Sequence, residues 1–325
     1  MAAAKRISIV IPCYNEAEAF PHLRAAVTEL VERVSQKYDV EVVLVNDGSK
    51  DGTWEQIVAF AREHRVVKGI DLSRNFGHQA ALSTGYQHAT GDAIVCLDAD
   101  LQDPPTVIDE MIAEWENGAD IVYAVRRKRA GESAFKLVTA SMFYRGLRLL
   151  GAPYLRADCG DFRLMSRASL DALLAMPEKH RFLRGMVGWI GFRTKDVHYD
   201  RLARVAGETK YPFRKMLKLA TDAVISSSTL PLRFPYYFAV TVTAFSALYL
   251  GYLGLSHWWT GQEFVRGWMS LVVLIVVFGC LNMISLGILG EYVGRIYEQA
   301  KDRPIAIVRE TVGGEAPAVP LRKAA

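Results

Sequence analysis

Two long stretches without Asp, Glu, Lys or Arg constrain this chain more than any other feature. They cover residues 235–262 and 267–290, and only Glu263 and Arg266 carry charge between them. Each stretch exceeds the roughly 20 apolar residues that a helix needs to span a bilayer core. A soluble protein could bury one such helix, but two in succession favour a transmembrane hairpin with spans at about 235–259 and 267–290.

Charged residues around these stretches predict an orientation. Lys218 and Arg233 precede the first span, and Arg295 and Arg303 follow the second. The positive-inside rule then places both ends of the hairpin in the cytoplasm and the connecting loop outside. Residues 1–6 lead directly into a strand-like segment without the apolar core of a signal peptide, so we expect a cytoplasmic N-terminal domain.

Charge and cysteine usage exclude several classes of function. The net charge of +4 is too small to indicate a nucleic-acid partner, and the basic residues beside the spans more simply meet anionic lipid headgroups. Four cysteines lie far apart without paired spacing, which favours reduced, buried thiols over a zinc or disulfide framework.

The first 125 residues alternate between strand and helix patterns. Strands are expected at 7–11, 40–45, 66–72, 93–97 and 120–125. A first helix is expected between the first two strands, ending at about residue 36, and further helices over 53–64, 78–88 and 104–117. Because the strands are almost continuously apolar, the pattern predicts an α/β fold with a parallel sheet covered on both faces. Ligands of such sheets bind at the carboxyl ends of the strands.

An acidic stretch, Asp98-Ala99-Asp100-Leu101-Gln102-Asp103, follows the fourth predicted strand. In extended geometry Asp98, Asp100 and Gln102 would share one face. Such hard oxygen ligands suit Mg²⁺ or Mn²⁺, particularly where substrate phosphates complete the coordination. The alternative is an acidic turn that caps the helix beginning near residue 104.

Polar residues also follow the first two strands. Tyr14, Glu16 and Asp47 offer an aromatic ring and carboxylates that suit a base and a ribose. Taken singly, each cluster is also typical of turns and helix caps. Together with an acidic pair two strands further along, they predict the layout needed to hold a nucleotide diphosphate.

Several motifs resemble a known family. Residues 9–16 (IVIPCYNE), 46–53 (NDGSKDGT) and 98–102 (DADLQ) resemble the hallmark motifs of glycosyltransferase family 2. More narrowly, the chain is similar to polyisoprenyl-phosphate glycosyltransferases, which include dolichol-phosphate mannose synthases and bacterial undecaprenyl-phosphate glucosyltransferases. This likeness is carried by residues 73–79, 126–133, 159–165, 180–185 and 206–211, and it extends to about residue 303.

The resemblance implies a donor site for a nucleotide sugar. Roles follow for these residues: Pro12, Tyr14, Glu16 and Asp47 for the nucleoside, Asp98 for the ribose–phosphate side, and Asp100 with Gln102 for Mg²⁺ or Mn²⁺. Asp100 is also assigned to catalysis through the metal, which would neutralise charge on the leaving diphosphate. Arg204 and Lys210 would reach the same phosphates, although residues of this kind equally suit a membrane surface.

The implied acceptor is a polyisoprenyl phosphate. A phosphate monoester has a second pKa of about 6 and is already nucleophilic at neutral pH, so no strong general base is required. Arg126, Arg129, Ser133 and Lys136 are the expected ligands of that phosphate. Asp161 is expected to orient sugar hydroxyls or assist proton movement, and in-line attack would invert the anomeric centre.

The resemblance implies the GT-A fold, and hydropathy, charge pattern and composition predict the rest of the domain plan. We expect a Rossmann-like GT-A domain over 1–210, amphipathic juxtamembrane helices over 211–234, the hairpin over 235–291 and a cytoplasmic tail over 292–325 that is disordered after residue 312. The predicted enzyme is a multi-pass protein of the bacterial cytoplasmic membrane, where it would supply a lipid-linked sugar for envelope glycans. Glycines in the second apolar stretch leave homo-oligomerisation open.

The sequence leaves rival functions. UDP-glucose is the preferred donor, with other UDP-sugars and GDP-mannose as alternatives. A processive polysaccharide synthase is disfavoured because residues 181–185 lack the Gln-x-x-Arg-Trp motif typical of those enzymes. A membrane-anchored nucleotide-binding scaffold without catalysis is disfavoured by the intact acidic pair.

Overall fold

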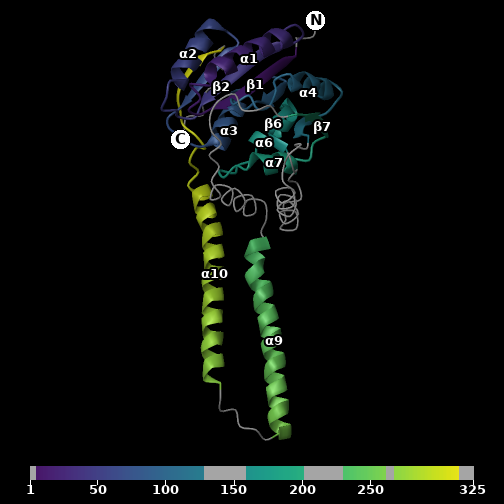
Figure 1. The fold of residues 1–325 in the computed structure, drawn as a ribbon, viewed down its shortest axis with the longest axis vertical. Coiled ribbons are helices and arrows are strands. Elements are labelled where there is room, and N and C mark those ends of the chain that lie inside the picture. The colour runs from purple at the N-terminus through teal and green to yellow at the C-terminus, as the bar shows by residue number, and fades with distance from the viewer. Residues whose placement is uncertain (1–4, 128–158, 201–229, 261–266, 315–325) are drawn as a thin grey trace. The chain divides into compact units, whose positions relative to one another are not determined.

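A computed structural model describes residues 5–127, 159–200, 230–260 and 267–314 (Figure 1). The strands are β1 (Arg6–Cys13), β2 (Asp39–Asn46), β3 (Val67–Leu72), β4 (Ala93–Cys96), β5 (Ile121–Arg126), β6 (Cys159–Ser166), β7 (Thr194–Tyr199) and β8 (Val308–Gly313). The helices are α1 (Phe20–Val34), α2 (Thr53–Glu63), α3 (His78–His88), α4 (Val107–Glu116), α6 (Arg167–Leu174), α7 (Leu183–Trp189), α9 (Leu230–Thr260) and α10 (Trp268–Ala300).

The strands form one sheet in the order β7-β5-β6-β4-β1-β2-β3-β8. β1 pairs in parallel with both β2 and β4, β2 with β3, and β5 with β7. β6 is antiparallel to both β4 and β5. The prediction of an α/β fold with a mostly parallel sheet is confirmed.

Alternate residues of each strand fill two cores, one on each face of the sheet. On β1, Ile9 and Ile11 face the core that α1, α2 and α4 cover, whereas Val10 faces the core under α3, α6 and α7. Helix α3 lies close against the sheet, because a Cβ on Gly85 would fall 2.3 Å from Cγ1 of Val10. This close packing fixes where the beginning of α3 meets the strand ends.

No strand is predicted from the sequence after residue 290, yet β8 pairs antiparallel with β3 at the edge of the sheet. Val312 packs against the core on the α2 side. Arg309 Nη1 lies 3.2 Å from Oδ2 of Asp71, and its Nη2 donates to the Ser73 carbonyl oxygen at 2.7 Å. The chain after α10 therefore contributes to the sheet and to the loop that follows β3.

The sheet with its covering helices forms one compact unit, and α9 and α10 belong to a second. In the described part of the chain, one helical segment, Leu274–Ala300, is long and apolar enough to cross a membrane, with a mean hydropathy of 2.0 over its most apolar 18 residues. Helix α10 thus continues ten residues beyond the charge-free stretch that ends at residue 290.

Candidate active site

The polar clusters predicted from the sequence meet at the carboxyl edge of the sheet. Asn15 connects the first two, because its backbone N–H donates to Oγ of Ser49 at 2.9 Å and its Oδ1 accepts from the Lys50 N–H at 2.9 Å. Asn15 has a φ of 54°, a left-handed conformation that asparagine tolerates better than most residues. Pro12 is buried at the end of β1, whereas Tyr14 is 43% exposed. The ring of Tyr14 is therefore available to a ligand.

Asp47 is held by the loop before α3. Its Oδ1 accepts from the Phe76 N–H at 2.7 Å and its Oδ2 from the Gly77 N–H at 3.0 Å. Burial raises the pKa of Asp47, although these two backbone hydrogen bonds oppose the shift. The carboxylate thus fixes residues 76 and 77, and its predicted contact with the nucleoside stays a prediction.

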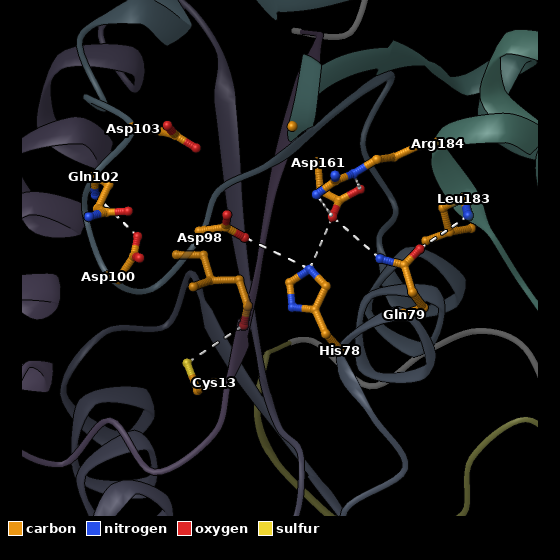
Figure 2. A network of polar contacts seen from close by, with 12 residues as sticks. Cys13, His78, Gln79, Asp98, Asp100, Gln102, Asp103, Asp161, Leu183 and Arg184 are labelled. Carbon is orange, nitrogen blue, oxygen red and sulfur yellow. Dashed lines mark hydrogen bonds and ion pairs between the residues drawn. The ribbon is translucent and has the colours of Figure 1, made fainter. Parts of the chain in front are cut away.

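The acidic stretch is a turn rather than the end of a strand. β4 ends at Cys96, and Leu101 adopts a φ of 52°. The backbone N–H of Gln102 donates to Oδ1 of Asp100 at 3.2 Å. The expectation that Asp98, Asp100 and Gln102 share one strand face is therefore wrong: Figure 2 shows Asp98 directed toward His78, with Asp100 and Gln102 on the other side of the turn.

Asp98 lies in a concentration of negative charge. Its side chain is 29% exposed, but its Oδ1 is buried and accepts no hydrogen bond. The pKa of Asp98 is raised from an ordinary 3.8 to about 6: burial is the largest cause, nearby Asp161, Asp103 and Asp100 act in the same direction, and His78 opposes the shift. A cation at this turn would relieve that repulsion.

Asp161, at the start of β6, is the centre of a buried ionic cluster (Figure 2). Arg163 Nη2 donates to its Oδ1 at 2.8 Å, and Arg184 donates to both oxygens, at 3.2 and 3.1 Å. Its side chain is 3% exposed. Burial alone would raise the pKa of Asp161, but His78, Arg184 and Arg163 outweigh burial and hold the pKa well below its usual range.

His78 and Gln79 were not assigned roles from the sequence, yet both reach Asp161 from the beginning of α3. Nε2 of His78 lies 3.4 Å from Oδ2 of Asp161 and 3.9 Å from Oδ1 of Asp98. Burial alone would lower the pKa of His78, but the two carboxylates outweigh it and raise the pKa. The sequence feature that could have identified both residues is their position at the start of a predicted helix, shortly after the end of a predicted strand.

Gln79 connects three elements. Its Nε2 donates to Oδ2 of Asp161 at 3.3 Å, and its Oε1 accepts from the backbone N–H of Leu183 at 3.1 Å. The amide thereby joins α3 to β6 and to the beginning of α7, which also carries Arg184 (Figure 2).

Arg126 ends β5 and is held in place by two neighbours. Its Nη2 lies 3.4 Å from both oxygens of Asp103, and its Nε donates to Oη of Tyr199 at 3.0 Å. The guanidinium-bearing side chain is still 26% exposed. The predicted residues Arg129, Ser133, Lys136, Arg204 and Lys210 lie outside the described part of the chain.

The turn offers oxygen ligands to a divalent ion. Within the described ranges, no group of three or more His, Cys, Asp and Glu side chains is arranged to hold a metal. Asp100 and Gln102 nevertheless lie together, and the buried Oδ1 of Asp98 lacks a hydrogen-bond partner. A site with few protein ligands, all of them hard oxygen donors, fits an ion whose coordination is completed by phosphates and water.

Comparisons with known proteins agree with the fold. The solved structure of glucosyl-3-phosphoglycerate synthase from Mycobacterium tuberculosis, in complex with Mn²⁺, UDP and phosphoglyceric acid, has a TM-score of 0.51 at 17% identity. The match covers 69% of this chain and 77% of that chain. At this identity the likeness concerns the fold alone, which is the GT-A fold.

Closer relatives match almost the whole chain. An uncharacterized glycosyltransferase of Bacillus subtilis is 44% identical, covering 95% of this chain and 94% of its own. A prophage bactoprenol glucosyl transferase homolog of Escherichia coli K12 is 41% identical, covering 94% of this chain and 98% of its own. The model of the family named glycosyl transferase family 2 matches residues 8–174. The chain therefore belongs to glycosyltransferase family 2 and is a sugar-transferring enzyme.

Proposed function

We propose that this enzyme transfers a hexose from a nucleotide-diphosphate sugar, with UDP-glucose as the preferred donor, to a polyisoprenyl phosphate such as undecaprenyl phosphate. The observation that carries the proposal is the 41% identity to the Escherichia coli bactoprenol glucosyl transferase homolog, which covers 94% of this chain. That match is too long to rest on the sheet domain alone, and so it includes residues beyond the shared family motifs.

The charge state of Asp161 supports a phosphate acceptor. A sugar hydroxyl needs a general base, and a carboxylate with a pKa well below its usual range is a poor one. A phosphate monoester is already ionised at neutral pH and needs no base. We assign Asp161 the role of orienting Arg184 and His78. In-line attack on the anomeric carbon would invert its configuration.

On the donor side, we assign the nucleoside to Pro12, Tyr14, Glu16 and Asp47 and its ribose–phosphate side to Asp98. Asp100 and Gln102 would hold Mg²⁺ or Mn²⁺, and Arg204 and Lys210 would reach the diphosphate. The ion, when bound, supplies charge neutralisation for the departing diphosphate. Arg126, Arg129, Ser133 and Lys136 would bind and orient the acceptor phosphate.

We propose that α9 and α10 form a transmembrane hairpin, with the sheet domain and both ends of the chain at the cytoplasmic face. Apolar side chains on these helices support this, since Leu248 and Trp258 in α9 and Leu274 and Met283 in α10 are all more than half exposed. Amphipathic helices over 211–234 would lie on the membrane, where the headgroup of the acceptor is found.

The test is transfer of radiolabel from a panel of sugar nucleotides to undecaprenyl phosphate, with and without Mn²⁺. UDP-glucose should give metal-dependent label in the organic phase. Label from GDP-mannose instead would establish the mannosyl alternative, and nucleotide binding without any transfer would indicate a scaffold.

Two substitutions provide the matched comparison. Asp100→Asn should abolish transfer while membrane insertion is retained. Asp109→Asn, which alters an exposed α4 carboxylate that pairs with Arg33, should leave transfer unchanged. Full activity of Asp100→Asn would overturn the proposed site.

A further inference from the structure

The end of the turn proposed to bind metal is held by contacts that reach across the sheet. Arg126 and Tyr199 are the last residues of β5 and β7 and are direct partners in that parallel pair. Asp103 lies beyond β4, and β6 separates β5 from β4 in the sheet. The side chain of Arg126 must therefore cross β6 to reach Asp103.

These contacts leave Asp103 tightly enclosed. Its carboxylate is 0% exposed, and Tyr199, which is 4% exposed, donates from Oη to its Oδ1 at 2.5 Å. Arg126 contacts both carboxylate oxygens and also donates to Oη of Tyr199. A buried carboxylate is costly without such donors, so the positions of the three side chains depend on one another.

Gly160 leaves room for the crossing. A Cβ at this position of β6 would lie 3.1 Å from Nη2 of Arg126. That distance is tighter than an ordinary contact, so a Cβ at 160 would require the guanidinium to shift by a few tenths of an ångström from its position beside Asp103. The lack of a side chain at Gly160 therefore leaves the space through which Arg126 reaches Asp103.

We propose that Tyr199 and Arg126 are positioning residues that hold the metal-binding turn in place through Asp103. Asp103 directly follows Gln102, and the left-handed φ of 52° at Leu101 is unfavourable for a leucine without support from the surrounding structure. Anchoring the carboxylate of Asp103 fixes the end of the turn on which Asp100 and Gln102 stand. This inference rests on the proposed assignment of Asp100 and Gln102 as metal ligands.

The test measures Mn²⁺ binding by the full chain in detergent micelles, followed by the electron paramagnetic resonance signal of free Mn²⁺, with UDP in one arm and GDP in the other. Tyr199→Phe removes only Oη and keeps the edge contact with Phe162, whose ring centroid is 5.8 Å away. We expect about tenfold weaker Mn²⁺ binding, as for other residues that orient metal ligands. Gly160→Ala should weaken binding in the same direction.

Tyr38→Phe is the matched control, because Tyr38 lies just before the first residue of β2. It is therefore at the amino ends of the parallel strands, away from the carboxyl ends where the turn lies. It should leave Mn²⁺ binding unchanged. A purely structural role of Tyr199 would lower the thermal unfolding temperature without changing Mn²⁺ affinity, and that result would overturn the proposal. If the unaltered chain binds no Mn²⁺ in either arm, the proposed metal site itself is wrong.

Discussion

Two carboxylates at the same edge of the sheet have opposite acid strengths. Asp98, after β4, has its pKa raised to about 6, whereas Asp161, at the start of β6, has its pKa held well below the usual range. Burial acts to raise the pKa of both, so it does not explain why the two shifts are opposite. Asp161 contacts two guanidinium groups, while Asp98 has other carboxylates nearby and only His78 to offset them.

The difference separates two kinds of site. The turn that carries Asp98 has excess negative charge, which an added cation would stabilise. The cluster around Asp161 already contains its cations, so its carboxylate is satisfied without a ligand. Four substitutions test this contrast, in order of decreasing expected effect.

Asp161→Asn should have the largest effect. It leaves Arg163 and Arg184 without their buried counter-charge, and we expect sugar transfer to fall by at least about a hundredfold. If Asp161 orients its neighbours and is not the base, as proposed, the residual activity should keep the pH profile of the unaltered enzyme. Transfer assays across pH 5.5–8.5 check this, and a lost acid limb in the variant would show that Asp161 does accept a proton.

Asp98→Asn should change how stability depends on pH. A carboxyl whose folded pKa is raised binds its proton more tightly in the folded state, so stability falls as pH rises from about 4 through about 6. The asparagine variant should lose this slope, a change of about 2 kcal/mol after allowance for partial exposure.

Thermal unfolding between pH 4 and 6 without added metal measures the slope. Asp161 has the opposite sign, since its lowered pKa contributes stability that is lost only as pH falls below about 4. An unchanged slope in Asp98→Asn would contradict the raised pKa of Asp98.

His78→Gln should reduce transfer about tenfold, because it removes a cation that faces both carboxylates. The raised pKa of His78 implies stability that is present below pH 6.5 and lost as pH rises above it. His88→Gln is the control, since His88 ends α3 away from the cluster. Equal effects of the two substitutions would argue against a role for His78 in the site.

Gln79→Leu should have the smallest effect, a loss of about 1 kcal/mol in stability and a few-fold loss of transfer. It removes the hydrogen bonds to Asp161 and to the Leu183 N–H, but leaves both guanidinium contacts of Asp161 in place. Gln56→Leu on α2, which removes a hydrogen bond to the Ala17 carbonyl oxygen, is the matched control. Stability loss without any loss of transfer in Gln79→Leu would limit Gln79 to a structural role.

The elements of the sheet up to β5 followed from the sequence. Helix and strand periods are local, and each predicted strand from residue 7 to 125 has its counterpart in the structure. The sequence also indicated that Asp47, Asp98 and Arg126 follow strand ends, because that requires only strand boundaries. It did not indicate their partners, since Asp47 is bound by Phe76 and Gly77 and Arg126 by Asp103 and Tyr199.

The sequence by itself thus determined the family, the strand–helix alternation and the apolar helices, all of which depend on residues near one another in the chain. Only the tertiary structure decided that β6 enters antiparallel between β4 and β5 and that β8 closes the β3 edge. This strand order brings Asp161 to His78 and Arg184 but leaves Asp98 among carboxylates. Opposite pKa shifts in two similar side chains therefore arise from which distant segments the sheet places beside each of them.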